Sequence, residues 1–332
     1  MKRFVIPILT VLAAALVAGG FTVRHALTAP KQNAESIVFE VAEGSTLGRV
    51  ARSLEQAGLV RRAWAFEGLA RWQKQGASLR AGEYELSAMQ SPAEILDRLA
   101  RGQVRTHPFS FPEGLTAAEI ATRFEEAGLA EAEEVLSLVH DAEFAAALRV
   151  EGDDLEGYLF PETYRWARGV GARAMVEDLV EQFRLAWAPL AEPAKARGLS
   201  MREVVVLASI VEKETGAPEE RPRIAAVFLN RLSRGMRLET DPAVIYGIPD
   251  FDGNLRRVHL EDASNAYNTY KIPGLPPGPI ANPGAAALRA VVEPNEDEEA
   301  LFFVSKNDGT HHFSRTYAEH ARAVNRYQRG HR

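Results

Sequence analysis

The chain has 332 residues, which is enough for two or three domains with separate cores. Its formal net charge of −6 offers no basic footprint for nucleic acid, and 25% charged and 46% hydrophobic residues are ordinary for a globular protein. Cysteine is absent, which excludes disulfides, thiolate metal sites and a cysteine nucleophile.

The N-terminal segment predicts a membrane anchor. Lys2 and Arg3 precede an uncharged run from Phe4 to Val23, which at about 1.5 Å per residue reaches roughly 30 Å, one hydrocarbon core. The run is longer than the core of a cleaved signal peptide, and Leu27-Thr-Ala29 is a poor cleavage site. A cleaved signal and a buried soluble helix are the alternatives. The basic residues favour a cytoplasmic N-terminus, so we expect a single-pass inner (plasma) membrane protein whose remaining chain faces the periplasm or the outside.

An internal repeat with an offset of 70 residues follows. The sequence Glu43-Gly44-x-Thr46 recurs as Glu113-Gly114-x-Thr116. In each copy the glycine predicts a turn and the threonine a helix N-cap, and the helices end at Gly58 and Gly128. Alternating apolar residues predict a strand before each turn, at 38–41 and 109–111.

The other patterns predict an α+β fold that becomes helix-rich from about residue 171. A strand is expected at Gly82–Leu86, and a helix at Pro92–Arg101 with proline near its first position. Further helices are expected at 131–139, 141–148, 172–190, 201–215, 219–232 and from about 316, with loops at 155–164 and 235–284 and strands at 301–304 and 312–313. The expected divisions are 1–23 (cytoplasmic tip and transmembrane anchor), 24–36 (linker), 37–105 (small module), 106–170 (second repeat and connection) and 171–332 (catalytic domain).

The most informative motif is Leu207–Thr215, where Glu212 follows an almost entirely apolar run. Apolar surroundings raise the pKa of a carboxyl group, which then keeps a proton near neutral pH and can act as a general acid. Helical geometry does not separate Glu212 from Glu214. The small residues Ala208 and Ser209 favour Glu212 slightly, leaving Glu214 to orient it or to bind substrate. A solvent-facing glutamate at a helix end is the structural alternative.

Serine and histidine chemistry has less support. Ser209 and Lys213 are spaced i, i+4 and could pair on a helix. No Ser-x-x-Lys occurs there, and Lys213-Glu-Thr is not Lys-Thr-Gly, so the penicillin-recognising pattern is absent. His311, His312 and His320 do not form a His-Glu-x-x-His pattern. We therefore expect no metal and no cofactor, with these histidines on solvent-facing positions.

The downstream loops offer groups that suit a sugar. Asp241 and Glu239 are the candidate partners if two carboxylates act, as in hydrolytic glycosidases, although Asp241-Pro242 is also a plain turn signal. The segment Tyr267–Tyr270, beside the rigid Gly274–Gly278, provides aromatic faces and an amide; loop packing is the alternative. The candidate substrate-binding residues are Ser209, Glu214, Glu239, Thr240, Asp241, Tyr267, Asn268 and Tyr270.

Taken together, the motifs resemble the membrane-anchored endolytic murein transglycosylases of the YceG-like type over nearly the whole chain. The residues that carry the resemblance are the anchor, Leu155–Tyr164, Ala208–Thr215, Asn230-Arg-Leu, Gly235-Met-x-Leu, Thr240-Asp-Pro, Val244–Gly247, Tyr267–Tyr270, Gly274–Ile280 and Asn282-Pro-Gly284. The resemblance also implies that residues 37–105 form a LysM-like module, which holds glycan or positions the catalytic domain.

The resemblance implies non-hydrolytic cleavage of nascent peptidoglycan between N-acetylmuramic acid and N-acetylglucosamine, leaving 1,6-anhydro ends. It implies one catalytic glutamate, matched here by Glu212, which protonates the glycosidic oxygen and then takes the proton of the C6 hydroxyl. It further implies glycan strands as substrate and penicillin-binding synthases of the elongation machinery as partners. The chain departs from the pattern at Glu239, which replaces a glutamine, and at Ala243, which replaces a threonine. The extra charge either raises the pKa of Glu212 further or only changes a hydrogen bond.

Three other functions remain open from the sequence. A hydrolytic muramidase would use Glu212 as acid and Asp241 or Glu239 as base. A non-catalytic, membrane-anchored wall-binding protein would not need Glu212. A peptidase or amidase would depend on Ser209 and would cut peptide cross-links while leaving the glycan intact.

Overall fold

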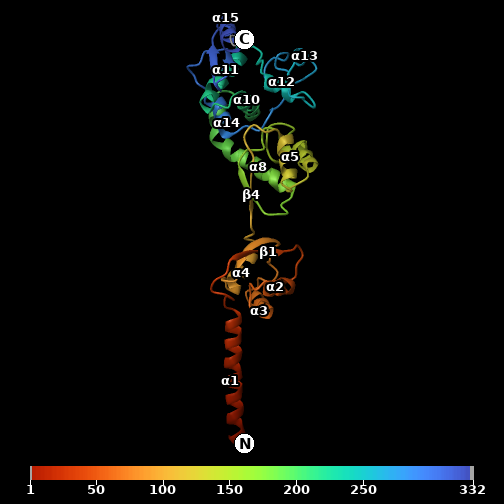
Figure 1. The fold of residues 1–332 in the computed structure, drawn as a ribbon, viewed down its shortest axis with the longest axis vertical. Coiled ribbons are helices and arrows are strands. Elements are labelled where there is room, and N and C mark those ends of the chain that lie inside the picture. Colours follow the sequence, from red (N-terminus) through yellow and green to blue (C-terminus); the bar gives the residue numbers. More distant parts are fainter. Residues whose placement is uncertain (1, 330–332) are drawn as a thin grey trace. The chain divides into compact units, whose positions relative to one another are not determined.

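The computed structural model describes residues 2–329 and shows a helix-rich α+β protein with small two-stranded sheets (Figure 1). The chain divides into two compact units. The first contains the chain up to Pro108 together with Arg165–Gly169, and the second contains Phe109–Tyr164 and the chain from Val170 on. Two of the boundaries between the units fall within β3 (His107–Ser110) and β4 (Thr163–Trp166).

Helix α1 (Lys2–Ala26) occupies the predicted N-terminal span. The first half of that span, Phe4–Ala13, lies outside the residues whose side chains are described. Among the described residues, no helix combines the length and the apolar character needed to cross a membrane.

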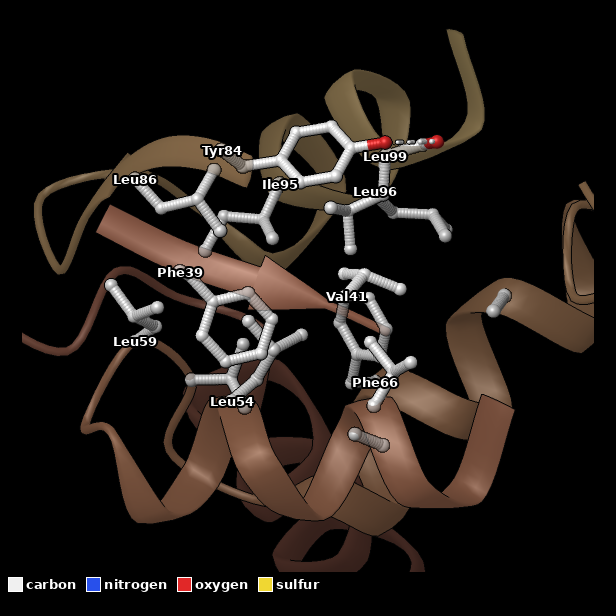
Figure 2. Packing of buried hydrophobic residues seen from close by; sticks show 14 of the residues in the cluster. Phe39, Val41, Leu54, Leu59, Phe66, Tyr84, Leu86, Ile95, Leu96 and Leu99 are labelled. Carbon is white, nitrogen blue, oxygen red and sulfur yellow. Dashed lines mark hydrogen bonds between the residues drawn. The ribbon is translucent and has the colours of Figure 1, made fainter. Parts of the chain in front are cut away.

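The first unit is built around an antiparallel pair, β1 (Ser36–Val41) and β2 (Gly82–Ser87), in which Phe39 lies opposite Tyr84. Because side chains alternate across a strand, these residues and their i+2 neighbours share one face, against which the helices of the unit pack. Figure 2 shows this core, closed by leucine and isoleucine side chains from the helices. The helices are α2 (Leu47–Gln56), α3 (Ala63–Trp72) and α4 (Pro92–Arg101).

The predicted repeat is confirmed, with one copy in each unit. Thr46 caps α2 and Thr116 caps α5 (Ala117–Glu126), and each threonine hydroxyl accepts a hydrogen bond from a backbone N–H in the first turn. The turns before them place Gly44 and Gly114 at φ of 69° and 79°, a left-handed conformation that favours glycine. The strand of the second copy, β3, spans 107–110, whereas 109–111 was predicted.

The second unit has three helices that pack on one another: α10 (Met201–Glu214), α11 (Arg221–Ser233) and α14 (Ala285–Val292) (Figure 1). A C-terminal hairpin, β5 (Phe302–Ser305) and β6 (His311–Ser314), contacts α15 (Tyr317–Val324). The remaining elements are α6 (Ala132–Val139), α7 (Ala142–Ala147), α8 (Ala172–Trp187), η1 (Ala188–Leu190), α9 (Ala191–Ala196), η2 (Pro218–Glu220), α12 (Asp241–Tyr246), α13 (Arg257–Glu261) and η3 (Asn325–Arg329).

The structure differs from the sequence prediction mainly in short elements. The section 235–284 was predicted as mostly loop but contains α12 and α13, and α3, α9 and α14 were not predicted. Helix α12 has six residues and starts at Asp241-Pro242, a pair that also suits a turn, so its local signal is ambiguous. The predicted loop 155–164 ends in strand, because Thr163 and Tyr164 begin β4.

Candidate active site

The site is organised by the C-terminal end of α10. Ser200 and Glu203 form a capping box at the start of this helix, and every residue from Val204 to Val211 is buried. The helix ends at Glu214, and Thr215 is extended. Glu212 and Glu214 are therefore both in its last turn, where side chains two residues apart point about 200° away from each other.

Glu212 is enclosed by a charge partner and a backbone donor. Arg221 Nη2 donates to its Oε1 at 2.8 Å, and the Gly284 N–H donates to its Oε2 at 3.1 Å. The side chain of Glu212 is 5% exposed and that of Arg221 is 10% exposed. Glu113 Oε2 lies 3.4 Å from the same guanidinium nitrogen. We call Glu113, Glu212, Arg221 and Gly284 the arginine cluster.

The arginine cluster joins the second repeat to α10 and α14. Glu113 covers Gly284 so closely that a Cβ at position 284 would come within 1.7 Å of Glu113 Oε1. Burial, followed by the neighbouring charge of Glu212, raises the pKa of Glu113, and Arg221 opposes this shift. Lys213 Nζ donates to the Gly114 carbonyl at 3.1 Å, which ties the same turn to the helix.

Glu214 has a different environment, with no basic partner among the described residues. The Thr240 hydroxyl donates to Glu214 Oε1 at 2.5 Å. Burial raises the pKa of Glu214 to about 7; the Thr240 hydrogen bond opposes the rise, and the negative charge of Asp241 adds to it. A carboxyl group with this pKa can both give and accept a proton near neutral pH.

Glu214 also lines a cavity of about 470 Å³. Glu239, Asp241 and Tyr270 line the same cavity, and the Tyr270 hydroxyl donates to Asp241 Oδ1 at 2.7 Å. Residues of the C-terminal hairpin and α15 also line it, among them Phe302, Tyr317 and His320. The cavity therefore places carboxyl groups and aromatic rings around one space, as expected of a site for a polar, ring-shaped ligand.

Arg231 fixes the position of Glu239. Its guanidinium is buried and donates to Glu239 Oε2 at 3.0 Å, to the Leu238 carbonyl at 2.6 Å and to the Leu301 carbonyl at 2.8 Å. Glu239 itself is at φ of 51°, an uncommon conformation for a residue other than glycine. The negative charge that Glu239 adds near the site is thus compensated by Arg231.

The structure brings five of the predicted site residues together: Glu214, Glu239, Thr240, Asp241 and Tyr270. Glu212 is in the arginine cluster and does not line this cavity. Among the described residues, no group of three histidine or carboxylate side chains is arranged to hold a metal ion.

The other predicted substrate-binding residues have structural contacts. The fully buried Ser209 hydroxyl donates to the Val206 carbonyl and accepts from the Ile280 N–H, so it is not poised as a nucleophile. The buried Asn268 side chain donates to the carbonyls of His259 and Leu260 in α13 and to that of Asp262, just after this helix. Tyr267 packs edge-on against Tyr246 at 4.8 Å and does not line the cavity.

Sequence reasoning did not assign a role in the site to Arg221, Arg231 or His320. It also missed a further buried carboxyl group, that of Glu156. The Ala117 N–H, Asn282 Nδ2 and the Tyr246 hydroxyl all donate to Glu156, which links α5, α12 and the segment before α14. Burial raises its pKa to about 7. Glu156 and Arg231 fall inside motifs already singled out, but the partners of Glu156 and the Leu301 carbonyl that Arg231 binds are far away in the sequence, so spacing alone did not indicate these contacts.

Comparison with known proteins finds a matching family model, similar sequences and a similar solved structure. A model of the YceG-like family matches residues 39–326. A Bacillus subtilis protein named endolytic murein transglycosylase is 27% identical over 330 residues, covering 94% of this chain and 91% of that protein. A Streptococcus pneumoniae protein with the same name is 28% identical over 362 residues; the match covers 98% of this chain but only 65% of that longer protein. The crystal structure of a yceG-like protein from Listeria monocytogenes superimposes with a TM-score of 0.60 at 30% identity, covering 87% of this chain and 98% of that one.

Proposed function

Because the chain belongs to the YceG-like family, we propose that it is an endolytic murein transglycosylase. It cuts the bond between N-acetylmuramic acid and N-acetylglucosamine within peptidoglycan strands and leaves a 1,6-anhydro end. The name of the relatives supports the reaction class, and the cavity beside α10 supports the location of the chemistry.

The observation that carries the assignment is the environment of Glu214. Its carboxyl group has a pKa raised to about 7 and lines a cavity large enough for a small ligand. We assign it the acid and base role that the sequence resemblance placed at Glu212. Glu212 accepts hydrogen bonds from Arg221 and from the Gly284 N–H, and it does not line the cavity.

The reaction needs one carboxyl group and no water. Protonated Glu214 gives its proton to the glycosidic oxygen as the bond to C1 of the muramic acid breaks. The resulting carboxylate takes the proton of the C6 hydroxyl, whose oxygen forms the new bond to C1. The proton count is restored, and the products have the mass of the substrate. Asp241 and Tyr270 provide polar groups for orienting the sugar in the same cavity.

A hydrolytic muramidase is the second candidate. Glu239 and Asp241 line the cavity with Glu214, so a second carboxylate is available to activate a water molecule. This reaction would add the mass of water to the products and would leave reducing ends.

The proposal extends to the location of the protein. The uncharged run Phe4–Val23 after Lys2 and Arg3 supports a single-pass inner (plasma) membrane anchor with the enzyme outside the cytoplasm. The first unit serves as a LysM-like module that positions the enzyme or holds glycan. A tethered enzyme of this kind reaches strands as they are made and can work beside penicillin-binding synthases.

The test compares the full-length chain in detergent with its Glu214→Gln variant on uncross-linked glycan polymer, with products read by mass spectrometry. Anhydro-ended fragments from the parent alone are expected. Products heavier by one water would favour the muramidase. Equal cleavage by both proteins would remove Glu214 from the chemistry, and no cleavage by either would favour a wall-binding role.

A further inference from the structure

The lining of the cavity that contains Glu214 also includes three neighbouring rings. Tyr317, with 71% of its surface exposed, meets Phe302 edge-on at 6.0 Å between ring centroids. His320 stacks on Phe302 at 5.3 Å with 24° between the ring planes, and lies 6.3 Å from Tyr317. We call Phe302, Tyr317 and His320 the ring platform.

The local fold keeps the ring platform in place. Thr316 and Glu319 form a capping box that starts α15, and Tyr317 and His320 are three residues apart, so they share a face of this helix. Phe302 is anchored in β5, where it lies opposite Ser314. The Arg231 guanidinium, which also binds Glu239, lies 5.1 Å from the centre of the Phe302 ring. Arg231 therefore contacts both the ring platform and Glu239.

His320 has hydrogen-bonding capacity that the described residues do not use. Its ring makes no hydrogen bond within the described part of the chain, and Nδ1 is buried. Burial, followed by the positive charge of Arg231, lowers the pKa of His320, while Glu239 opposes the shift. A neutral imidazole offers one N–H donor and one acceptor, and leaving the buried Nδ1 without a partner is costly.

The residues around the cavity indicate which class of ligand it binds. Three carboxyl groups line the cavity, and Arg231, the one arginine among the described lining residues, is paired with Glu239, so an anionic ligand would be repelled. The exposed Tyr317 ring packs best against an apolar face of a ligand. The His320 imidazole needs a hydrogen-bonding group at the edge of that ligand. A pyranose ring has both, since its axial C–H groups lie on its faces and its hydroxyl and acetamido groups lie at its edge.

We propose that the ring platform is a binding subsite for an N-acetylhexosamine unit next to the bond that is cut. Tyr317 stacks on the C–H face of the sugar, and His320 hydrogen-bonds to its polar edge. The inference rests on the proposed function, because it takes the glycan strand as substrate, and it adds the residues that hold the strand.

Binding is tested in the full-length Glu214→Gln chain, which should bind sugar without cutting it, with chitotetraose as the probe and calorimetry as the readout. Tyr317→Ala should raise Kd about tenfold, whereas Tyr317→Phe, which keeps the ring, should stay close to the parent. His320→Phe keeps the stacking but loses the nitrogens, and should raise Kd about fivefold. Tyr327→Ala is the matched control, since Tyr327 belongs to the same C-terminal segment but does not line the cavity.

Equal Kd values for Tyr317→Ala, His320→Phe and the control would overturn the subsite. The same comparison in the active chain separates this failure from failure of the proposed function. If the parent cuts glycan strands and Tyr317→Ala leaves KM unchanged, only the subsite is wrong. If the parent neither binds chitotetraose nor cuts strands, the proposed function and the subsite fail together. A raised KM with circular dichroism unchanged from the parent would support the subsite.

Discussion

Glu212 and Glu214 lie two residues apart at the end of α10 and meet opposite surroundings. Glu212 faces the arginine cluster, where a guanidinium and a backbone N–H bind both of its oxygens. Glu214 faces the cavity, where a threonine hydroxyl is its partner and burial raises its pKa to about 7. The comparison shows that burial at the end of an apolar helix does not by itself make a candidate acid, because the carboxyl group must also line the cavity, as Glu214 does and Glu212 does not.

Replacing each glutamate with glutamine tests most directly whether Glu212 and Glu214 have different roles. Glu214→Gln should lower kcat/KM for glycan strands by about 10²–10⁴-fold, the usual contribution of a general acid. Glu212→Gln should cause a loss of less than about 10²-fold, since Glu212 acts by positioning the helix end. Both are measured by initial rates at a temperature where circular dichroism shows the variants folded. A larger loss in Glu212→Gln would reverse the two roles.

Removing Arg221 tests whether the arginine cluster is mainly structural. Arg221→Met leaves the nearly inaccessible Glu212 without its charge partner, so the free energy of unfolding should fall by about 3–5 kcal/mol. Denaturant titration followed by circular dichroism measures this. Arg257→Met is the matched control, because the pair between Arg257 and Glu261 is exposed to solvent and contributes little. Similar losses in both variants would contradict the assignment.

The close contact between Gly284 and Glu113 can be tested in the same way, with a smaller expected loss of stability. Gly284 has φ of −79°, which alanine adopts readily, so the only obstacle to Gly284→Ala is the Glu113 side chain. We expect Gly284→Ala to lower the free energy of unfolding by about 1–3 kcal/mol, as overpacking does. Adding Glu113→Ala should restore most of the loss, because it removes the atoms that clash. Additive losses in the double variant would show that the contact is not the cause.

The smallest expected effect is on the pH dependence of cleavage. An acid must be protonated to act, so kcat/KM should be high below the pKa of Glu214 and fall as the pH rises through about 7. Asp241→Asn removes a charge that raises this pKa, so the fall should begin at lower pH. Thr240→Val removes a hydrogen bond that lowers the pKa, so the fall should begin at higher pH. Shifts in the same direction for both variants would contradict this account of Glu214.

Much of the local structure could be predicted from the sequence. The repeat, its capping threonines, the strand at β2 and the helices α4 and α10 follow from signals within a few residues of each element. The motif Leu207–Thr215 also identified the helix end that carries the site. The short helices α12 and α14 were not predicted, because α12 starts at Asp241-Pro242, a pair that also suits a turn, and α14 directly follows Asn282-Pro-Gly284, which also favours a loop.

Within this protein, the sequence by itself determined the helix end on which two candidate glutamates lie, since capping and apolar periodicity are local properties. Only the tertiary structure decided which glutamate faces the cavity. That choice depends on Arg221 and Gly284 on one side of α10, and on Thr240 and the C-terminal hairpin on the other. Charge compensation and burial come from residues up to about a hundred positions away, and the spacing of residues along the chain does not record them.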